Sequence, residues 1–269
     1  MTIKLPNFNI YYDSTPKVAC TSIKHWLYYI AFNEEFKAYK NGTKRFNIHN
    51  FNRDAFRDNS KKFLFLKRHQ MFDALKLSKE KIFYFCIIRN PHKRILSAYS
   101  NRVGYHNELS IKKGVSLQDF LSKGLKPDPD INDFIQNLEE YQGLKGSILH
   151  HTRPAISFLD RKMRYTNAYS MDCLQYLVKD LRDFLKDECS DRKVAVPDIP
   201  RLQTGGKKVD MSHLSPINFR KICDYYASDY KYIAKIKQRH STISNMNYEE
   251  TRKEYIGCVR NWTNHNIPI

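Results

Sequence analysis

Residues 16–22 (PKVACTS) have the composition of a loop that binds phosphate groups. They lie between an expected strand at 8–12 and a helical pattern, and a helix start offers free N–H groups and a dipole that favours an anion. Ala19 is small enough to let phosphate oxygens approach the backbone, and Lys17 adds a positive charge. The segment lacks the GxxxxGK[ST] pattern of ATP- and GTP-hydrolysing proteins. Taken alone, it also fits an ordinary helix N-cap.

A second candidate anion site follows the apolar run 82–88, which is typical of a strand buried on both faces of a parallel sheet. Arg89 ends this strand, Pro91 opens the next helix, and Ser97 lies about two helical turns further on. A guanidinium fork together with a hydroxyl suits a phosphate monoester. Alone, Arg89 fits equally well as an ion-pair partner at a strand end.

The order of the expected elements predicts an α/β fold with a central parallel sheet and helices on both sides. Open sheets of this kind bind ligands at the carboxyl ends of their strands, where both candidate segments lie. We expect strands at 8–12, 63–66, 82–88 and 164–169, helices at 71–77, 171–186 and 216–236, and loops at 33–60 and 191–212. The helical middle, 116–142, has Phe120, Leu121, Phe134, Ile135 and Leu138 as core candidates.

The charge indicates an anionic partner. Lys and Arg number 46 against 28 Asp and Glu, which gives +18 and a pI near 9.5. The basic residues are spread along the chain, so a generally basic solvated surface remains an alternative. No Cys/His cluster has zinc-ligand spacing, and no run of 18 apolar residues predicts a membrane span. We therefore expect no stable membrane anchor and a cytoplasmic location.

Together, the two segments resemble the sulfotransferases that use 3'-phosphoadenosine-5'-phosphosulfate (PAPS). Residues 16–22 are similar to the 5'-phosphosulfate loop of the carbohydrate, sulfotransferase family 2-like branch, and Arg89 with Ser97 is similar to the 3'-phosphate element. The resemblance covers roughly residues 8–236. It implies a P-loop-like nucleotide-binding sulfotransferase domain over 1–239 and leaves 240–269 as an extension of unknown role.

The resemblance also implies roles for individual residues. The Lys17 ammonium would offset charge on the bridging oxygen as the S–O bond breaks, and no metal would be needed. Cytosolic small-molecule sulfotransferases carry Gly where this chain has Ala19, which favours the carbohydrate branch. Animal members of that branch are anchored in the Golgi, so a lumenal Golgi domain is the alternative location. The implied donor-binding residues are Lys17, Val18, Ala19, Cys20, Thr21, Ser22, Arg89, Ser97 and Lys207. The segment that contains Lys207 fits a solvated turn equally well.

The sequence indicates the residues that would act on the acceptor less clearly. His69 follows the strand at 63–66 and precedes Arg89 by 89 − 69 = 20 residues, as the base does in similar sulfotransferases. Imidazole suits proton transfer near neutral pH. His151 and a carboxylate elsewhere stay open as alternative bases. Three basic residues are candidates to line a groove for an acidic acceptor: Lys67, Arg68 and Arg153. The alternative is that they are ordinary surface residues.

Together, these residues and the resemblance predict transfer of a sulfuryl group from PAPS to a saccharide or polyanionic glycan, releasing adenosine 3',5'-bisphosphate, with no nucleic-acid partner. The alternatives are sulfation of a non-carbohydrate small molecule, a P-loop kinase that needs ATP and Mg²⁺, and a basic polyanion-binding protein without catalysis. The absent GK[ST] pattern counts against the kinase. A mere binder leaves the spacing of Arg89 and Ser97 unexplained.

Overall fold

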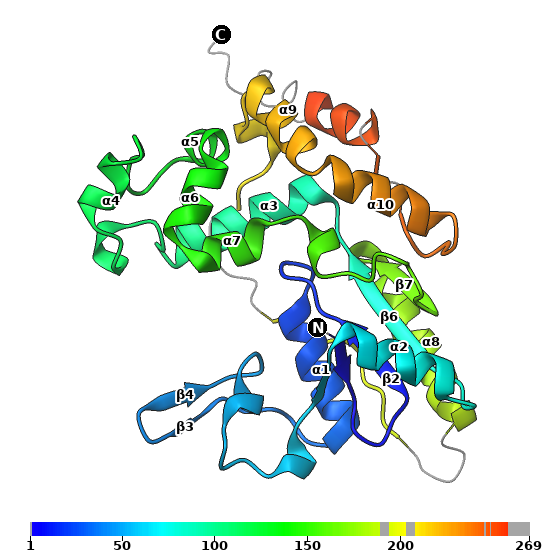
Figure 1. Ribbon diagram of the computed structural model, residues 1–269. Helices are drawn as coiled ribbons and strands as arrows, with labels where there is room; N and C mark the ends of the chain where they lie inside the picture. Colours follow the sequence, from blue (N-terminus) through cyan, green and yellow to red (C-terminus); the bar gives the residue numbers. More distant parts are fainter. Residues whose placement is uncertain (1, 189–193, 203–207, 245, 248, 258–269) are drawn as a thin grey trace. The chain divides into compact units, whose positions relative to one another are not determined.

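The computed structural model describes residues 2–188, 194–202, 208–244, 246–247 and 249–257 (Figure 1). The chain divides into two compact units. Unit 1 comprises 1–88, 158–204 and 239–244, and unit 2 comprises 89–157, 205–238 and 245–269. Within the described part of the chain, none of the helices is both long and apolar enough to cross a membrane.

Unit 1 is built on a five-stranded sheet in the order β5-β1-β2-β6-β7. The β2–β6 and β6–β7 pairs are parallel, which confirms the predicted α/β class with a mostly parallel central sheet. β1 runs antiparallel to both of its neighbours, and this strand was not predicted, because three residues are too few to show a periodicity. The strands are β1 (Thr2–Lys4), β2 (Ile10–Asp13), β5 (Leu64–Leu66), β6 (Phe83–Ile88) and β7 (Asn167–Ser170).

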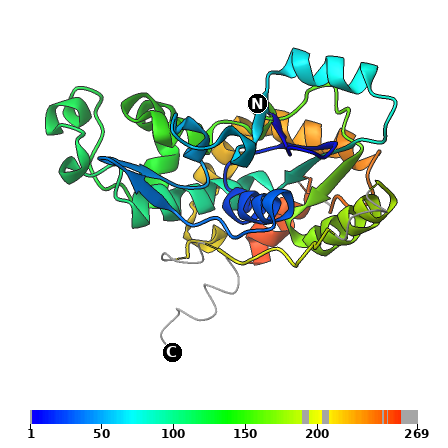
Figure 2. The ribbon, with the colours of Figure 1, turned by 90° about the horizontal axis from the view of Figure 1, so that it is seen from below.

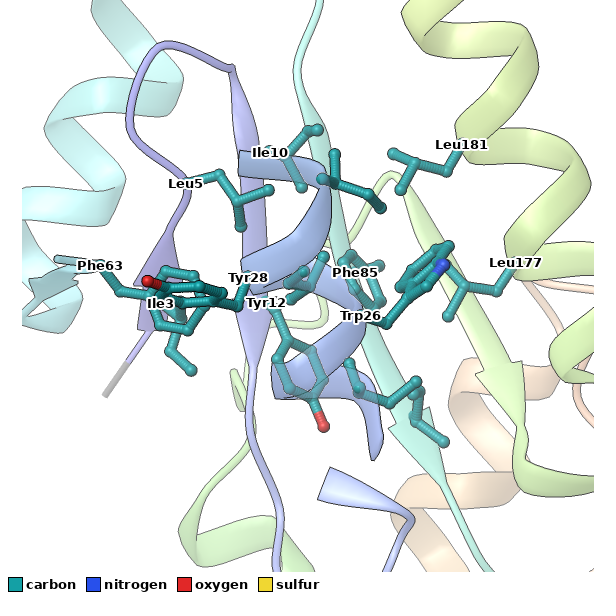
Figure 3. Packing of buried hydrophobic residues seen from close by; sticks show 14 of the residues in the cluster. Ile3, Leu5, Ile10, Tyr12, Trp26, Tyr28, Phe63, Phe85, Leu177 and Leu181 are labelled. Carbon is teal, nitrogen blue, oxygen red and sulfur yellow. The ribbon is translucent and has the colours of Figure 1, made fainter. Parts of the chain in front are cut away.

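Three helices accompany this sheet: α1 (Cys20–Phe32), α2 (Arg68–Leu77) and α8 (Leu174–Glu188). Figure 2 shows α1 and α8 on one side of the sheet and α2 on the other. Trp26 of α1 and Leu177 of α8 share one apolar cluster with Phe85 of β6 (Figure 3). Their burial makes the α1 face of the sheet the main source of hydrophobic stabilisation in unit 1.

The polar segment 33–60, expected as loop, contains a small separate hairpin. It is formed by β3 (Tyr39–Asn41) and β4 (Lys44–Phe46). Gly42 turns the chain between them with φ 57°, a left-handed conformation that glycine adopts without strain. Phe46 contributes to the core of unit 1, so a segment with few apolar residues still has a buried anchor.

Unit 2 is helical in its described part. Phe120, Phe134, Ile135 and Leu138 are buried as predicted, whereas Leu121 is exposed, so that core assignment was wrong. The single helix expected over 216–236 is interrupted at Tyr226, whose buried hydroxyl donates to the Thr152 carbonyl. The helices are α3 (Pro91–Tyr99), α4 (Leu117–Leu121), α5 (Ile131–Gln136), α6 (Leu138–Leu144), α7 (Gly146–Thr152), α9 (Pro216–Tyr225), α10 (Ala227–Lys237) and a helix over 249–257.

A buried carboxylate fixes the end of β2. Asp13 accepts hydrogen bonds from the hydroxyls of Thr2 (2.6 Å), Tyr84 (2.8 Å) and Tyr165 (2.7 Å). These donors come from β1, β6 and the segment before β7, so one side chain joins three parts of the sheet. A buried charge is tolerated only when it is hydrogen-bonded in this way. Burial and the nearby Asp13 charge raise the pKa of Tyr84 well above its usual value, which keeps it a donor.

We predict that Asp13→Ala lowers the free energy of unfolding by about 3 kcal/mol or more, because three buried hydroxyls lose their acceptor. Chemical denaturation measures this loss. The control is Asp73→Ala on the exposed surface of α2, which should change stability by less than about 0.5 kcal/mol. Equal losses in the two variants would contradict the network's role.

Candidate functional site

The loop between β2 and α1 has an unusual backbone. Lys17 and Ala19 both adopt left-handed conformations, with φ of 66° and 58°. Ala19 is the N-cap of α1, where it has no side-chain acceptor to offer, and no acidic residue lies in the first turn. The first helical hydrogen bond runs from the Ile23 N–H to the Ala19 carbonyl, so the preceding N–H groups lie at the positive end of the helix dipole.

Buried side chains hold this loop against unit 1. Val18 belongs to the apolar cluster beneath α1. Thr15 is fully buried, and among the described residues its hydroxyl has no hydrogen-bond partner. A buried hydroxyl without a partner in a loop of this shape is compatible with an oxygen-rich ligand that accepts a hydrogen bond from it. The loop therefore has the features of an anion site: a positive helix start, Lys17 and a hydroxyl that needs an acceptor.

Two side chains of α1 contact the chain that precedes residue 203. The Ser22 hydroxyl accepts the Leu202 N–H at 3.1 Å, and the Trp26 indole donates to the Pro197 carbonyl at 2.7 Å. The chain before residue 203 is thereby attached along α1. Residues 203–207 follow directly, so the predicted donor ligand Lys207 lies outside the described residues.

His49 is a neighbour of this helix start that the sequence did not indicate. Its Nε2 lies 2.9 Å from the Thr21 hydroxyl and its Nδ1 lies 3.3 Å from the Lys24 ammonium. Burial lowers the pKa of Lys24. His49 follows the β3–β4 hairpin in a segment without periodicity, so nothing in the sequence connected it with residues 16–22. The structure places a cation and an imidazole beside the candidate loop.

Candidate base His69 lies at the same edge of the sheet as this loop. Thr2 of β1 pairs with Leu66 on one side and with Asp13 on the other, so β5 and β2 end at the same level. These two ends are two strand spacings apart, about 10 Å. His69 is exposed in the first turn of α2, one turn after the chain leaves β5.

Lys67 and Arg68 precede His69 at the start of α2. Lys67 is the exposed N-cap of α2, and its backbone N–H donates to the Gln70 side chain at 2.8 Å. Arg68 is the first residue of the helix. The role of these two residues in binding an acceptor stays a prediction.

Arg89 and Ser97 belong to unit 2. Arg89 is half-buried between the end of β6 and the start of α3, and Ser97 lies on the second turn of α3, also half-buried. Pro91 occupies the first turn, where its missing N–H removes no hydrogen bond. The sequence therefore placed both residues on the correct elements, a strand end and the helix after it.

Arg94 is a buried residue of α3, and its contacts are structural. Its guanidinium donates to the carbonyls of His151 (3.3 Å) and Arg153 (2.6 Å) and lies 3.8 Å from the Asp229 carboxylate. The Asp229 carboxylate in turn accepts hydrogen bonds from the backbone N–H groups of residues 155 and 156. Arg94 thus anchors the segment that carries Arg153, a half-buried residue predicted to contact the acceptor.

His92 is a second buried residue of α3. Burial, together with the charges of Lys93 and Arg89, lowers the pKa of His92 to about 3. The imidazole is therefore neutral throughout the physiological range and adds no charge beside Arg89.

The predicted site residues fall into two groups, one in each unit. Unit 1 contains the loop at 16–22 and the segment at 67–69, whereas unit 2 contains Arg89, Ser97 and Arg153. Among the described residues, no three His, Cys, Asp or Glu side chains gather as metal ligands.

The sequence model of the Sulfotransferase family matches residues 2–249. The match includes both groups of predicted site residues and ends at the start of the helix at 249–257. Neither a curated protein nor a solved structure matches the chain.

The left-handed backbone at Ala19 gives a direct prediction. An L-residue loses roughly 1–2 kcal/mol in this conformation, whereas glycine adopts it freely. Ala19→Gly should therefore leave the free energy of unfolding unchanged or raise it by up to about 1 kcal/mol, as measured by chemical denaturation. The control, Ala31→Gly within α1, should lower it by about 1 kcal/mol. Similar losses at the two positions would contradict the left-handed start of the helix.

Proposed function

Because the chain belongs to the Sulfotransferase family, we propose that it transfers a sulfuryl group from PAPS to a hydroxyl of a saccharide acceptor. The observation that carries this proposal is the uncapped, left-handed start of α1 with Lys17 beside it. Such a loop is suited to a group with several anionic oxygens, as the 5'-phosphosulfate is.

The proposal assigns the donor's two ends to two sets of residues. Backbone N–H groups from Lys17 to Ser22 bind the 5'-phosphosulfate, and the buried Thr15 hydroxyl is available as a further donor. Arg89 and Ser97 bind the 3'-phosphate, which distinguishes PAPS from ordinary adenylates. Lys207, outside the described residues, is proposed as a further contact of the donor.

The transfer is an in-line displacement at sulfur. The acceptor oxygen forms a bond to sulfur while the bond from sulfur to the bridging phosphate oxygen breaks, and the electron pair of that bond leaves with adenosine 3',5'-bisphosphate. The Lys17 ammonium stabilises the charge that develops on the bridging oxygen. His69 takes the acceptor proton, because it lies at the edge of the sheet where the loop begins.

The saccharide acceptor is supported by the likeness of PKVACTS to the carbohydrate branch and by the charge of +18, which suits an acidic glycan. Lys67, Arg68 and Arg153 are the proposed contacts. A non-carbohydrate hydroxyl is the alternative acceptor. Transfer of radiolabel from PAPS to a panel of glycans and phenols decides between the two.

We predict that Lys17→Ala lowers kcat by about a hundredfold or more, because the leaving oxygen loses its counter-charge. Arg89→Ala should weaken binding of adenosine 3',5'-bisphosphate by about ten- to a hundredfold, the range expected for a lost charged hydrogen bond. Radiolabel transfer measures the first and titration calorimetry the second.

The matched controls for these two variants are exposed residues of the same type, Lys37→Ala and Arg220→Ala. Both should behave as the unchanged protein. Normal turnover in Lys17→Ala, or normal bisphosphate binding in Arg89→Ala, would overturn the corresponding assignment.

His69→Ala should lower kcat by about 10²–10⁴ and leave the affinity for adenosine 3',5'-bisphosphate unchanged, because a base acts on the acceptor proton and not on the nucleotide. Single-turnover transfer with saturating donor measures this effect. His151→Ala is the competing variant: a collapse of turnover there, with His69→Ala active, would move the base to His151.

A further inference from the structure

The helix at 249–257 begins where the match to the family ends (red in Figure 1). Asn247 starts it, since its side-chain oxygen accepts the Glu250 N–H at 2.8 Å and its carbonyl accepts the Thr251 N–H at 3.0 Å. The ordinary features of a capped helix are therefore present in a segment to which the sequence gave no role.

This helix is attached to the core of unit 2. The Tyr255 ring stacks on Phe219 of α9, with centroids 4.2 Å apart and planes 10° from parallel, and its hydroxyl donates to the Leu214 carbonyl at 3.1 Å. Thr251 has no exposed surface. A helix held by a stacked aromatic pair and a fully buried side chain is an integral part of unit 2.

The inner face of the helix contacts the segment that carries Arg89. The Asn90 amide nitrogen donates to the Thr251 hydroxyl at 3.3 Å, and the Tyr230 hydroxyl lies 3.5 Å from the Asn90 amide oxygen. One turn further along the helix, Glu254 forms an ion pair with Lys93 of α3 at 2.9 Å.

Asn90 occupies a position where its side chain would normally have another partner. It is the N-cap of α3, and Asn is among the residues preferred there because its side-chain oxygen can accept an N–H of the first turn. Here Asn90 makes no such cap. Its buried amide is directed instead to Thr251 and Tyr230, so those two side chains contact the Arg89–Pro91 turn.

We propose that the helix at 249–257 is a positioning element for the adenosine 3'-phosphate subsite, acting through Thr251 on Asn90 and thereby on Arg89. This rests on the proposed function, in which Arg89 binds that phosphate. Thr251 does not touch the nucleotide. It restricts the backbone from which the Arg89 side chain extends, which reduces the entropy lost when the phosphate binds.

The test compares two nucleotides that differ only in the 3'-phosphate. Titration calorimetry gives the ratio of the affinities for adenosine 3',5'-bisphosphate and adenosine 5'-phosphate. Thr251→Val, which keeps the shape but removes the hydroxyl, should weaken bisphosphate binding about three- to tenfold and leave adenosine 5'-phosphate binding unchanged. Thr251→Ser, which keeps the hydroxyl, should retain the ratio of the unchanged protein.

Glu249→Gln, an exposed residue of the same helix, is the control for any change in this segment and should also retain the ratio. Thermal unfolding of each variant shows that it is folded at the temperature of the titration. Thr251→Val with an unchanged ratio overturns the inference, and so does an equal loss of affinity for both nucleotides. If the unchanged protein itself does not distinguish the two nucleotides, the proposed function fails, and this result is separate from the first two.

Discussion

The proposed function depends first on the start of helix α1. Ala19 has no side chain that can accept the N–H groups of the first turn, and both Ala19 and Lys17 are held in left-handed conformations. Backbone of this kind persists only where surrounding structure enforces it. The buried Asp13 network fixes the strand before the loop, Val18 packs in the core and His49 contacts Thr21, so neighbouring residues of unit 1 maintain the unfavourable conformation.

In unit 2, buried polar residues hold the backbone that carries the candidate site residues. Arg89 and Ser97 lie on the turn and helix that follow β6, and buried polar residues around them hold this backbone. Arg94 connects α3 to the segment before Arg153, while Asn90 connects it to α10 and to the helix at 249–257. Polar groups buried with their partners specify one arrangement of the chain more strictly than apolar contacts do.

The sequence predicted the parts of this fold that have a strong local signal. The apolar run at 82–88, the Pro91 helix start and the position of residues 16–22 between strand and helix each follow from side-chain types over a few residues. The antiparallel β1, the interruption at Tyr226 and the exposure of Leu121 depend on tertiary contacts that no local pattern reports. His49 and Thr251 could not be predicted for the same reason: each is far in sequence from the helix start that it contacts.

We propose that the 16–22 loop and the Arg89 element bind the two phosphate-bearing ends of one nucleotide. Calorimetric titration of the unchanged protein with adenosine 3',5'-bisphosphate, adenosine 5'-phosphate and adenosine 3'-phosphate tests it most directly. We expect the bisphosphate to bind at least about tenfold more tightly than either monophosphate, because each lost phosphate removes a charged hydrogen-bonding partner. Equal affinity for all three nucleotides would contradict it.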